Sequence, residues 1–428
     1  MIQYIPGTQD FLDLTHFNNI TSLIRKHLSS ASFHEIMTPL IERTDLFVKS
    51  LGKETDVISK ELYLVSSHHM PEAERSELCL RPEATASTMR AFLNHHVQDK
   101  PWNVFTIGPM FRHDRPQKGR YRQFHQASLE IINSTSIAQD ARLITLLDRL
   151  FQEQLNLKDY ALLINFMGCP EDRVTYEKIL REFIAKHAHE ICATCTKRSS
   201  TNLLRIFDCK NSTCQALYQQ VPPITDSICA ACTQEWQLLQ SLLRQLSVSY
   251  SHAPQLVRGL DYYEKTVFEF VSNDLGAQNT FCGGGRYNRL SSRLGAKENV
   301  PAIGAAIGIE RMMLLTEATM RDALVETPLH LVVPMSADQW LLALQLVDTL
   351  HMAQAQAGMQ PYEVEALLEG DSLKSMLRQA NKRGARTVII IGSEEQASGT
   401  VSVKNMRTSN EEKIKHVELV HYIQQLAR

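Results

Sequence analysis

Arg112 and Glu130 are the first side chains whose types and spacing could do chemistry. They belong to segments 102–115 and 121–133, which alternate like paired antiparallel strands around the polar loop RPQKGR. Gln126 and Glu130 share one face because strand side chains alternate, and the neighbouring strand can present Arg112 to that face. Such groups bind a ligand or form an internal ion pair, because burying them unpaired is costly. The spacing leaves both interpretations open.

Three later segments carry further candidates. Arg258 and Asp261 lie in LVRGLDYY, and an arginine beside tyrosines suits a carboxylate or a phosphate. GGGR at 283–286 allows a ligand to approach the backbone closely, although a glycine triplet also suits a simple turn. GAAIGIER at 304–311 places small residues ahead of a helix, which fits a bound nucleotide or tight packing.

Six of the nine cysteines fall between residues 192 and 232, as three closely spaced pairs. Zn²⁺ takes two thiolates from each of two such short loops. We expect one structural zinc ion on Cys192, Cys195, Cys209 and Cys214, with Cys229 and Cys232 as substitutes for either pair. The alternative is a set of reduced cysteines in a helical insertion. Cys79, Cys169 and Cys282 are expected to be unpaired.

Composition excludes several classes of protein. The 428 residues are 43% hydrophobic and 21% charged, which is typical of a globular chain and not of a disordered one. No apolar stretch reaches the roughly 18 residues of a membrane span, and the N-terminus resembles neither a signal nor a transit peptide, so we expect a cytoplasmic protein. The net charge of −2 disfavours nucleic acid unless basic residues are clustered, as they are at 115–122.

Several elements must position these residues. Apolar periodicity predicts helices over 12–31, from Thr85, and after the small residues at 304–308, while 170–245 is mostly helical. FCGGGRYNRL is expected to be rich in turns. From residue 328 strands alternate with helices, which predicts a separate α/β unit with a largely parallel sheet.

Taken together and in this order, RPEATA, FRHDRPQKGRYRQFHQ, LVRGLDYY, CGGGRY and GAAIGIER resemble the histidyl-tRNA synthetase family. FHEIMTPLIERTDLF, FRHDRPQKGRYRQFHQ and GAAIGIER resemble the three class II synthetase motifs, and SLKSMLRQANKRG with ASGTVSVKNM resembles the family's anticodon-binding domain. The implied fold is an α+β class II catalytic domain, an antiparallel sheet flanked by helices, over residues 1–169 and 246–325. A helical cysteine-bearing insertion would span 170–245, and an α/β anticodon-binding domain 328–428.

The resemblance also implies an activity. The chain would be a histidine–tRNA ligase that forms histidyl-adenylate from histidine and ATP, releases pyrophosphate and transfers histidine to the 3′ end of tRNA(His). Mg²⁺ would accompany ATP, and the first motif implies a homodimer. The catalytic residues would be Arg112 and Arg258, which with Arg311 would also bind ATP. Histidine would be held by Glu83, Thr85, Gln126, Glu130, Tyr263 and Tyr287.

Contacts with tRNA are implied at two basic places. The hairpin tip would contribute Gln117, Lys118, Arg120 and Arg122. In the C-terminal domain Lys374, Arg378, Lys382 and Arg386 recur at four-residue steps, so we expect them on one face of a helix that meets a phosphate backbone. A solvated helix face is the alternative.

Three positions depart from the family pattern. Ala84 replaces the glycine of PEGT and would weaken substrate binding if that position needed a positive φ or a close approach of the substrate. Asn288 replaces an aspartate after GGRY, and Ala305 replaces a bulkier residue. Two rival functions are a non-catalytic paralogue that regulates a phosphoribosyltransferase and an RNA-binding protein without adenylation. The anticodon-binding domain and Arg258 argue against the paralogue, and the presence of Arg112, Arg258 and Arg311 argues against the RNA-binding protein.

Overall fold

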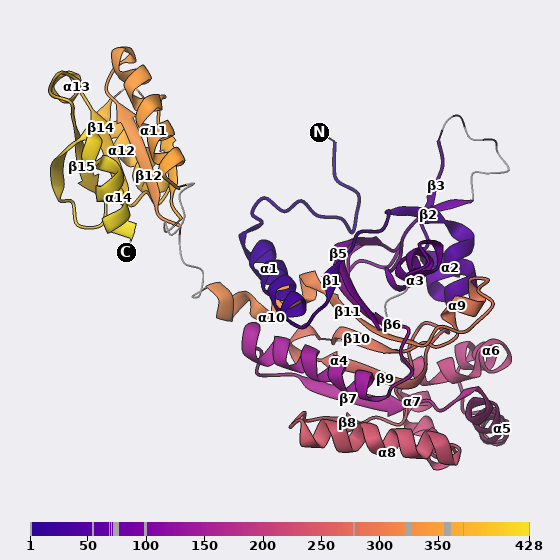
Figure 1. Cartoon of the computed structure of the whole chain (residues 1–428). Helices are drawn as coiled ribbons and strands as arrows, with labels where there is room; N and C mark the ends of the chain where they lie inside the picture. Colours follow the sequence, from indigo (N-terminus) through magenta and orange to yellow (C-terminus); the bar gives the residue numbers. More distant parts are fainter. Residues whose placement is uncertain are drawn as a thin grey trace. The chain divides into compact units, whose positions relative to one another are not determined.

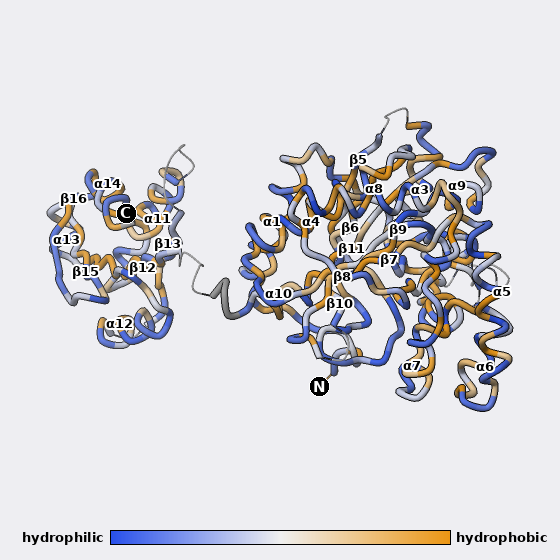
Figure 2. The backbone as a smooth tube through the Cα atoms, turned by 90° about the horizontal axis from the view of Figure 1, so that it is seen from below, coloured by the Kyte–Doolittle hydropathy of each residue, from blue (hydrophilic) through white to orange (hydrophobic). Residues whose placement is uncertain are grey.

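The computed structural model describes residues 2–53, 55–67, 69, 71, 77–97, 101–276, 279–321, 327–354, 361–370 and 372–427. The chain forms two compact units, 1–321 and 322–428, and each is described here by itself (Figure 1). In both units hydrophobic segments run through the central strands, while outer turns are mostly hydrophilic (Figure 2).

The larger unit is built on an eight-stranded sheet. Among the six central strands, neighbours are antiparallel. Each short edge strand is parallel to the strand beside it: β1 to β5, and β8 to β7. The order across the sheet is β1 (His34–Glu35), β5 (Trp102–Phe111), β6 (Gln123–Ile132), β11 (Ala302–Gly308), β10 (Thr280–Arg286), β9 (Glu264–Val271), β7 (Ala161–Phe166) and β8 (Ser251–His252). The antiparallel class II sheet expected from the sequence is confirmed.

Helices cover both faces of this sheet. One face packs against α1 (Thr15–Ser30), α4 (Ala138–Arg149), α8 (Ala230–Gln245) and α10 (Ile309–Arg321). The other packs against α2 (Thr44–Leu51), α3 (Thr85–Asn94) and the segment that follows β7. A small antiparallel sheet of β2 (Ile41–Arg43), β4 (Leu78–Leu80) and β3 (Leu64–Val65) leads into α3. Short helical turns follow at Val57–Glu61 and Leu150–Gln154, with a further one at Asn273–Leu275 and a last helix at α9 (Leu290–Arg293).

The segment between β7 and β8 is helical, as its sequence predicted. It contains α5 (Pro170–Lys186), α6 (Ala193–Thr201), α7 (Ser212–Tyr218) and α8, with 3₁₀ turns at Leu203–Asp208 and Ile224–Asp226. It shares a continuous apolar core with α2, α3 and the sheet, so the insertion packs onto the catalytic sheet.

The smaller unit has a five-stranded sheet in the order β13 (Glu363–Ala366), β12 (Leu329–Pro334), β14 (Thr387–Ile391), β15 (Thr400–Asn405) and β16 (Glu411–Lys415). The first three strands are parallel and the last two form an antiparallel hairpin. Its helices are α11 (Trp340–Gln354), α12 (Leu373–Lys382), α13 (Ser393–Ser398) and α14 (Leu419–Ala427), with short turns at Ala337–Gln339 and His416–Glu418. The expected α/β alternation is therefore present.

One local prediction was wrong. FCGGGRYNRL was expected to be rich in turns, but its glycines lie within β10, in the middle of the sheet. A Cβ on Gly284 would lie 2.2 Å from the Gly304 oxygen on the adjacent strand. The glycines allow close packing between strands, which sequence spacing could not distinguish from a turn.

Candidate active site

A cavity of about 390 Å³ opens over the middle of the large sheet, and the three arginines predicted to bind ATP line it. Arg112 follows β5, Arg258 precedes β9 and Arg311 lies in the first turn of α10, so distant segments converge. We call this cavity with Arg112, Arg258 and Arg311 the arginine pocket. Gln126 of β6 also lines it.

Arg112 is fixed by its neighbours and not by Glu130. Its Nε donates to the Pro82 oxygen at 2.9 Å, and its guanidinium lies 5.5 Å from the centre of the Phe124 ring. Burial lowers its pKa, while Glu61 and Glu83 raise it. The internal Arg112–Glu130 pair left open by the sequence is therefore not formed.

The other two arginines also have partners that set their direction. Arg258 forms an ion pair with Glu269 and lies 5.8 Å from the Tyr263 ring centre. Burial opposes its charge, but the Glu269 carboxylate acting together with Tyr263, Tyr262 and Cys282 outweighs that effect, so the pKa of Arg258 is raised. Arg311 donates from Nε to the Gly119 oxygen at 3.0 Å, which ties the hairpin loop to α10. Three guanidinium groups therefore lie around one cavity, each held by its own partners.

A second group of predicted residues lies deeper in the unit. Glu130 accepts a hydrogen bond from the Thr85 hydroxyl at 2.7 Å and another from the Tyr287 hydroxyl. Burial raises the pKa of Glu130 to about 8, although both hydroxyl donors act in the opposite direction. We call Glu130, Thr85 and Tyr287 the Glu130 cluster. Tyr263 lies beside it, with its ring centre 6.4 Å from that of Tyr287.

Glu83 connects this cluster to the start of α3. Its two carboxylate oxygens accept from the backbone N–H groups of Thr85, at 2.7 Å, and Ala86, at 2.9 Å. Burial raises the pKa of Glu83, while these two backbone donors lower it. A buried carboxylate thus holds the helix terminus that carries Thr85.

Glycines make room for both groups. A Cβ at Gly304 would lie 1.6 Å from Glu130 Oε2, and one at Gly283 would lie 2.5 Å from Arg258 Nη1. The glycines flagged in the sequence therefore stand against functional side chains, where a methyl group would collide with them.

The backbone at Ala84 does not need glycine. Its φ of −104° is ordinary for any residue, so no positive φ is required and alanine is unstrained. Asn288 has a specific partner, because its Oδ1 accepts from Arg286 Nη1 at 3.2 Å.

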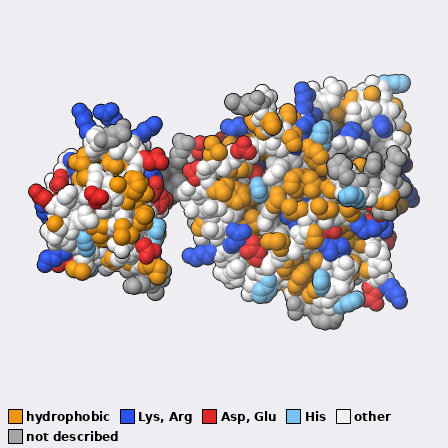
Figure 3. Space-filling model, turned by 90° about the horizontal axis from the view of Figure 1, so that it is seen from above, with side chains coloured by type: hydrophobic (Ala, Val, Ile, Leu, Met, Phe, Trp, Pro, Cys, Tyr) orange, Lys and Arg blue, Asp and Glu red, His pale blue; other side chains and the backbone are white. Residues whose placement is uncertain are grey.

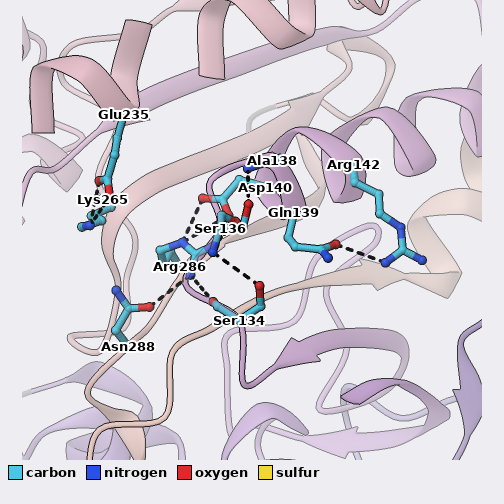
Figure 4. Close-up of polar contacts among 10 residues, drawn as sticks. All are labelled: Ser134, Ser136, Ala138, Gln139, Asp140, Arg142, Glu235, Lys265, Arg286 and Asn288. Atoms are coloured by element: carbon cyan, nitrogen blue, oxygen red, sulfur yellow. Dashed lines mark hydrogen bonds and ion pairs between the residues drawn. The ribbon is translucent and has the colours of Figure 1, made fainter. Parts of the chain in front are cut away.

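Arg286, within the GGGR segment, is a structural residue. It is 1% exposed and pairs with the fully buried Asp140 of α4, its Nε lying 3.1 Å from both carboxylate oxygens. It also donates to the backbone oxygens of Ser134 and Ser136, which surround it in Figure 4. This pair fastens α4 to β10 and explains why an arginine ends a glycine-rich strand.

Of the four candidate residues at the hairpin tip, two point into solvent and two contact other parts of the chain. Gln117 and Lys118 are exposed, whereas Arg120 lines the arginine pocket and pairs with Asp114. Arg122 donates to the Pro6 oxygen at 3.0 Å. Two side chains are thus free to meet a partner molecule and two are engaged within the chain.

In the smaller unit, Lys374, Arg378 and Lys382 lie on α12 and are exposed. Arg386 does not share their face, because α12 ends at Lys382 and Gly384 adopts a positive φ of 70°. The expectation that all four cations lie on one helix is therefore wrong for Arg386. Gly384, two residues after the helix, was the sequence signal that the helix ends before Arg386.

The cysteines form two separate groups of candidate metal ligands. Cys192, Cys195, Cys209 and Cys214 are together, with their sulfur atoms all within 4.8 Å of one another. Cys192 begins α6 and Cys214 lies in α7, so two helix starts face each other. The proposed substitutes Cys229 and Cys232 do not join this group, and Cys169 is not isolated. All three lie in the other group, with Asp172.

Sequence reasoning missed several residues of the pocket, among them Arg205 and Glu269. Arg205 of the insertion lines it and pairs with Asp56 at 3.0 Å, and no motif marks this arginine. Glu269, the partner of Arg258, lies in β9 and was not among the predicted site residues. Its inward-facing charge among apolar neighbours was an available signal.

The antiparallel sheet, the converging arginines and the α/β unit define a class II aminoacyl-tRNA synthetase. A profile of the family described as "Histidyl-tRNA synthetase" matches residues 9–312, and one described as "Anticodon binding domain" matches 331–426. The chain therefore belongs to the histidyl-tRNA synthetase family, whose members are aminoacyl-tRNA ligases.

Individual relatives agree. The chain is 39% identical to the histidine–tRNA ligase of Oleidesulfovibrio alaskensis, covering 92% of each chain. It is 38% identical to that of Halothermothrix orenii, covering 98% of each. The apo histidyl-tRNA synthetase structure from S. aureus aligns with a TM-score of 0.80 and 29% identity, over 99% of this chain and 100% of that one.

Proposed function

We propose that the arginine pocket and the Glu130 cluster together carry out the histidine–tRNA ligase reaction of this family. The observation that carries the proposal is the convergence of Arg112, Arg258 and Arg311 on one cavity. In the first step a carboxylate oxygen of histidine attacks the α-phosphorus of ATP, and pyrophosphate leaves. In the second step a ribose hydroxyl of tRNA(His) attacks the acyl carbon, and AMP leaves.

Arg112 and Arg258 act on the reacting atoms. Arg112 holds the α-phosphate, and Arg258 bridges the same phosphate and the carboxylate of histidine. Fixed guanidiniums stabilise charge that develops in the transition state without the cost of reorienting water. Arg311 contacts the outer phosphates and the base. Its tie to Gly119 suggests that the hairpin loop closes over bound ATP.

The Glu130 cluster selects histidine. Glu130 accepts a ring N–H of the imidazole, and the hydroxyls of Tyr263 and Tyr287 meet the other edge. Glu83, Thr85 and Gln126 face the α-ammonium group. An amino acid without a ring N–H would leave the buried Glu130 carboxyl with only its two hydroxyl donors and no compensation for an added charge, so it is rejected strongly.

Mg²⁺ fits the same pocket by the chemistry of its donors. The carboxylates of Glu61, Asp114, Glu269 and Glu310 line the cavity, and oxygen donors of this kind suit a hard cation. When bound with ATP, the ion would neutralise charge on the outer phosphates. The chain's own arginines orient the α-phosphate.

We place tRNA contacts at the hairpin tip and on the smaller unit. Gln117 and Lys118 are exposed and suit the acceptor end, with Arg120 and Arg122 shaping the loop from inside. Lys374, Arg378 and Lys382 on α12, with Arg386 beside it, offer positive charge to the phosphate backbone of the anticodon arm.

We propose that a zinc ion with a structural role binds Cys192, Cys195, Cys209 and Cys214. Backbone N–H groups of Cys192 and Asn211 point at the sulfurs of Cys214, at 3.3 Å, and Cys209, at 3.4 Å. Such donors stabilise metal-bound thiolates, and four thiolates leave no open position for catalysis.

A homodimer is supported by the surface of the first motif. Met37 is 91% exposed and Ile41 is 48% exposed, with Leu40 between them also exposed. Figure 3 shows hydrophobic side chains gathered on the upper face of the larger unit, the side on which β2 lies in Figure 1. A second copy of the chain that covers this segment would remove it from water.

We also propose a cytoplasmic location, where tRNA and ATP are available. Among the described residues, no helix combines the length and apolar character needed to cross a bilayer.

The deciding experiment is amino-acid-dependent exchange between ATP and pyrophosphate. We expect exchange with histidine and at most a trace with glutamine or phenylalanine. A folded chain that shows no exchange with histidine would contradict the proposal and favour a non-catalytic paralogue.

A further inference from the structure

A second group of candidate ligands, Cys169, Asp172, Cys229 and Cys232, lies apart from the four-cysteine group. We propose that it binds a structural zinc ion at the base of the helical insertion. The proposal does not depend on the residue roles assigned to the active site.

The four residues occupy equivalent positions at two helix starts. Cys169 is the residue before α5 and Asp172 is its third residue, while Cys229 and Cys232 hold the same positions on α8. Each helix therefore supplies a pair of ligands separated by two residues, as in short zinc-chelating loops. All four ligand atoms lie within 4.8 Å of one another. Tetrahedral zinc with bonds of about 2.3 Å to sulfur needs separations of about 3.8 Å, so small side-chain rotations suffice.

Asp172 already joins the two helix starts. Its Oδ2 accepts from the Cys169 N–H at 3.0 Å, and its Oδ1 accepts from the Cys229 N–H at 2.7 Å. Each carboxylate oxygen has a second lone pair, so one of them can bind a metal without losing these bonds. The backbone donors would then act as the outer contacts that orient metal ligands.

Charge also favours a cation held by thiolates here. Two helix N-termini meet at the group, and their positive ends offset part of the cost that burial and the Asp172 carboxylate place on anionic sulfur. Three sulfurs and one oxygen suit zinc, whereas Mg²⁺ and Ca²⁺ require oxygen ligands. Helix capping accounts for Asp172 and Cys169, which form a capping box at the start of α5. It gives no reason for Cys229 and Cys232 to lie beside them.

The place in the fold gives the ion a purpose. The chain leaves the catalytic sheet after β7 through Cys169 and returns through α8, which starts after Cys229. An ion at this point would fasten the beginning of the insertion to its end. The gain should be large, because closing a long loop removes much freedom from the unfolded chain.

The proposal is tested by measuring how much zinc the chain binds when each group of ligands is removed in turn. Protein purified without chelator is measured for zinc per chain, together with a Cys229→Ser/Cys232→Ser variant and a Cys192→Ser/Cys195→Ser variant. Cys79→Ser is the matched control, because Cys79 is buried and belongs to neither group. We expect two zinc equivalents in the parent and the control, one for each group, and one in each double variant. Circular dichroism checks that the variants are folded.

Cobalt makes the result independent of variant folding. The metal-depleted parent, refilled with Co²⁺, should take up two equivalents with distinct visible spectra, one of four thiolates and one of three thiolates and an oxygen. Asp172→Asn should alter the second spectrum alone. Saturation of the parent at the four-thiolate site alone would overturn the proposal. So would a folded Cys229→Ser/Cys232→Ser variant that keeps the parent's zinc, or a disulfide among Cys169, Cys229 and Cys232 in the untreated parent.

Discussion

The arginine pocket and the Glu130 cluster belong to the same sheet but hold their charges in opposite ways. Around the pocket, Arg258 is matched by Glu269 and Arg120 by Asp114, so charge is balanced at an open cavity. In the cluster, Glu130 is 1% exposed and its donors are two neutral hydroxyls. The Glu130 carboxyl therefore has a raised pKa and no positive partner of its own.

This difference assigns different tasks to the two regions. Balanced charges at an open surface can be exchanged for a triphosphate at small cost, which suits binding and transition-state stabilisation. A buried carboxyl without a cation is unsatisfied as an anion until a donor arrives, which suits selection of one substrate. We therefore expect changes in the pocket to lower kcat, and changes in the cluster to alter the KM for histidine.

The largest effect is expected from Arg258→Ala. It removes a preorganised charge from the reacting carboxylate and phosphate, so kcat for histidine-dependent pyrophosphate exchange should fall about 10²- to 10³-fold. Arg25→Ala is the matched control, because Arg25 is exposed and pairs with Glu35 at the surface. A loss below tenfold, with Arg25→Ala unchanged, would remove Arg258 from the reaction.

Glu130→Gln should have the next largest effect, and on a different quantity. Glutamine keeps the size and can still meet Thr85 and Tyr287, but it cannot become an anion. Losing a charged hydrogen bond to the imidazole should raise the KM for histidine about 10- to 10²-fold, while the KM for ATP stays unchanged. A Glu153→Gln control, at an exposed surface glutamate that pairs with Arg149, should change neither constant. An equal rise in both KM values would break the division between the two regions.

The same carboxyl predicts a dependence on pH. With a pKa near 8, Glu130 of the free enzyme is mostly protonated at neutral pH, whereas binding histidine favours the anion. The KM for histidine should therefore rise as pH falls below 8, by up to about tenfold per unit. Glu130→Gln should remove the part of this slope that does not come from histidine's own titration.

The raised pKa of Glu130 also predicts how the free energy of unfolding changes with pH. The unfolded carboxyl has a pKa of about 4.3, so between that value and 8 the folded state binds more protons than the unfolded one. Stability of the parent then decreases as pH rises through this window. Urea unfolding at pH 5 and pH 8 should show Glu130→Gln gaining relative to the parent at the higher pH, and no gain would contradict the raised pKa.

Much of both regions could be predicted from the sequence. Alternation located β5 and β6, and a polar loop located the hairpin, so Arg112 and Gln126 were expected in one place. Arg258 and Arg311 were tied to them through motif resemblance and not through spacing. Local periodicity determines which elements form, but it does not state which distant segments meet.

The rest depended on three-dimensional packing. Arg205 comes from the insertion, and its place in the pocket depends on how the helices of the insertion pack onto α2 and α3. Cys169 looked isolated because its partners Cys229 and Cys232 lie on the far side of the insertion in sequence. Asp140 gave no signal for pairing with Arg286, since the two belong to a helix and a strand far apart in the chain.

The smallest effect is expected from Asn288→Asp, which restores the carboxylate typical of the family. Asn288 accepts a hydrogen bond from Arg286, but Asp140 already neutralises that guanidinium. A new carboxylate at position 288 would therefore gain little attraction from Arg286. Partial burial of the aspartate costs desolvation that offsets the attraction, and the free energy of unfolding should change by less than about 1 kcal/mol. Pyrophosphate exchange should stay within about threefold, because Arg286 faces α4 and does not line the arginine pocket. A change in exchange larger than tenfold would mean that this structural ion pair controls the Glu130 cluster through the adjacent Tyr287, and the separation of tasks would need to include it.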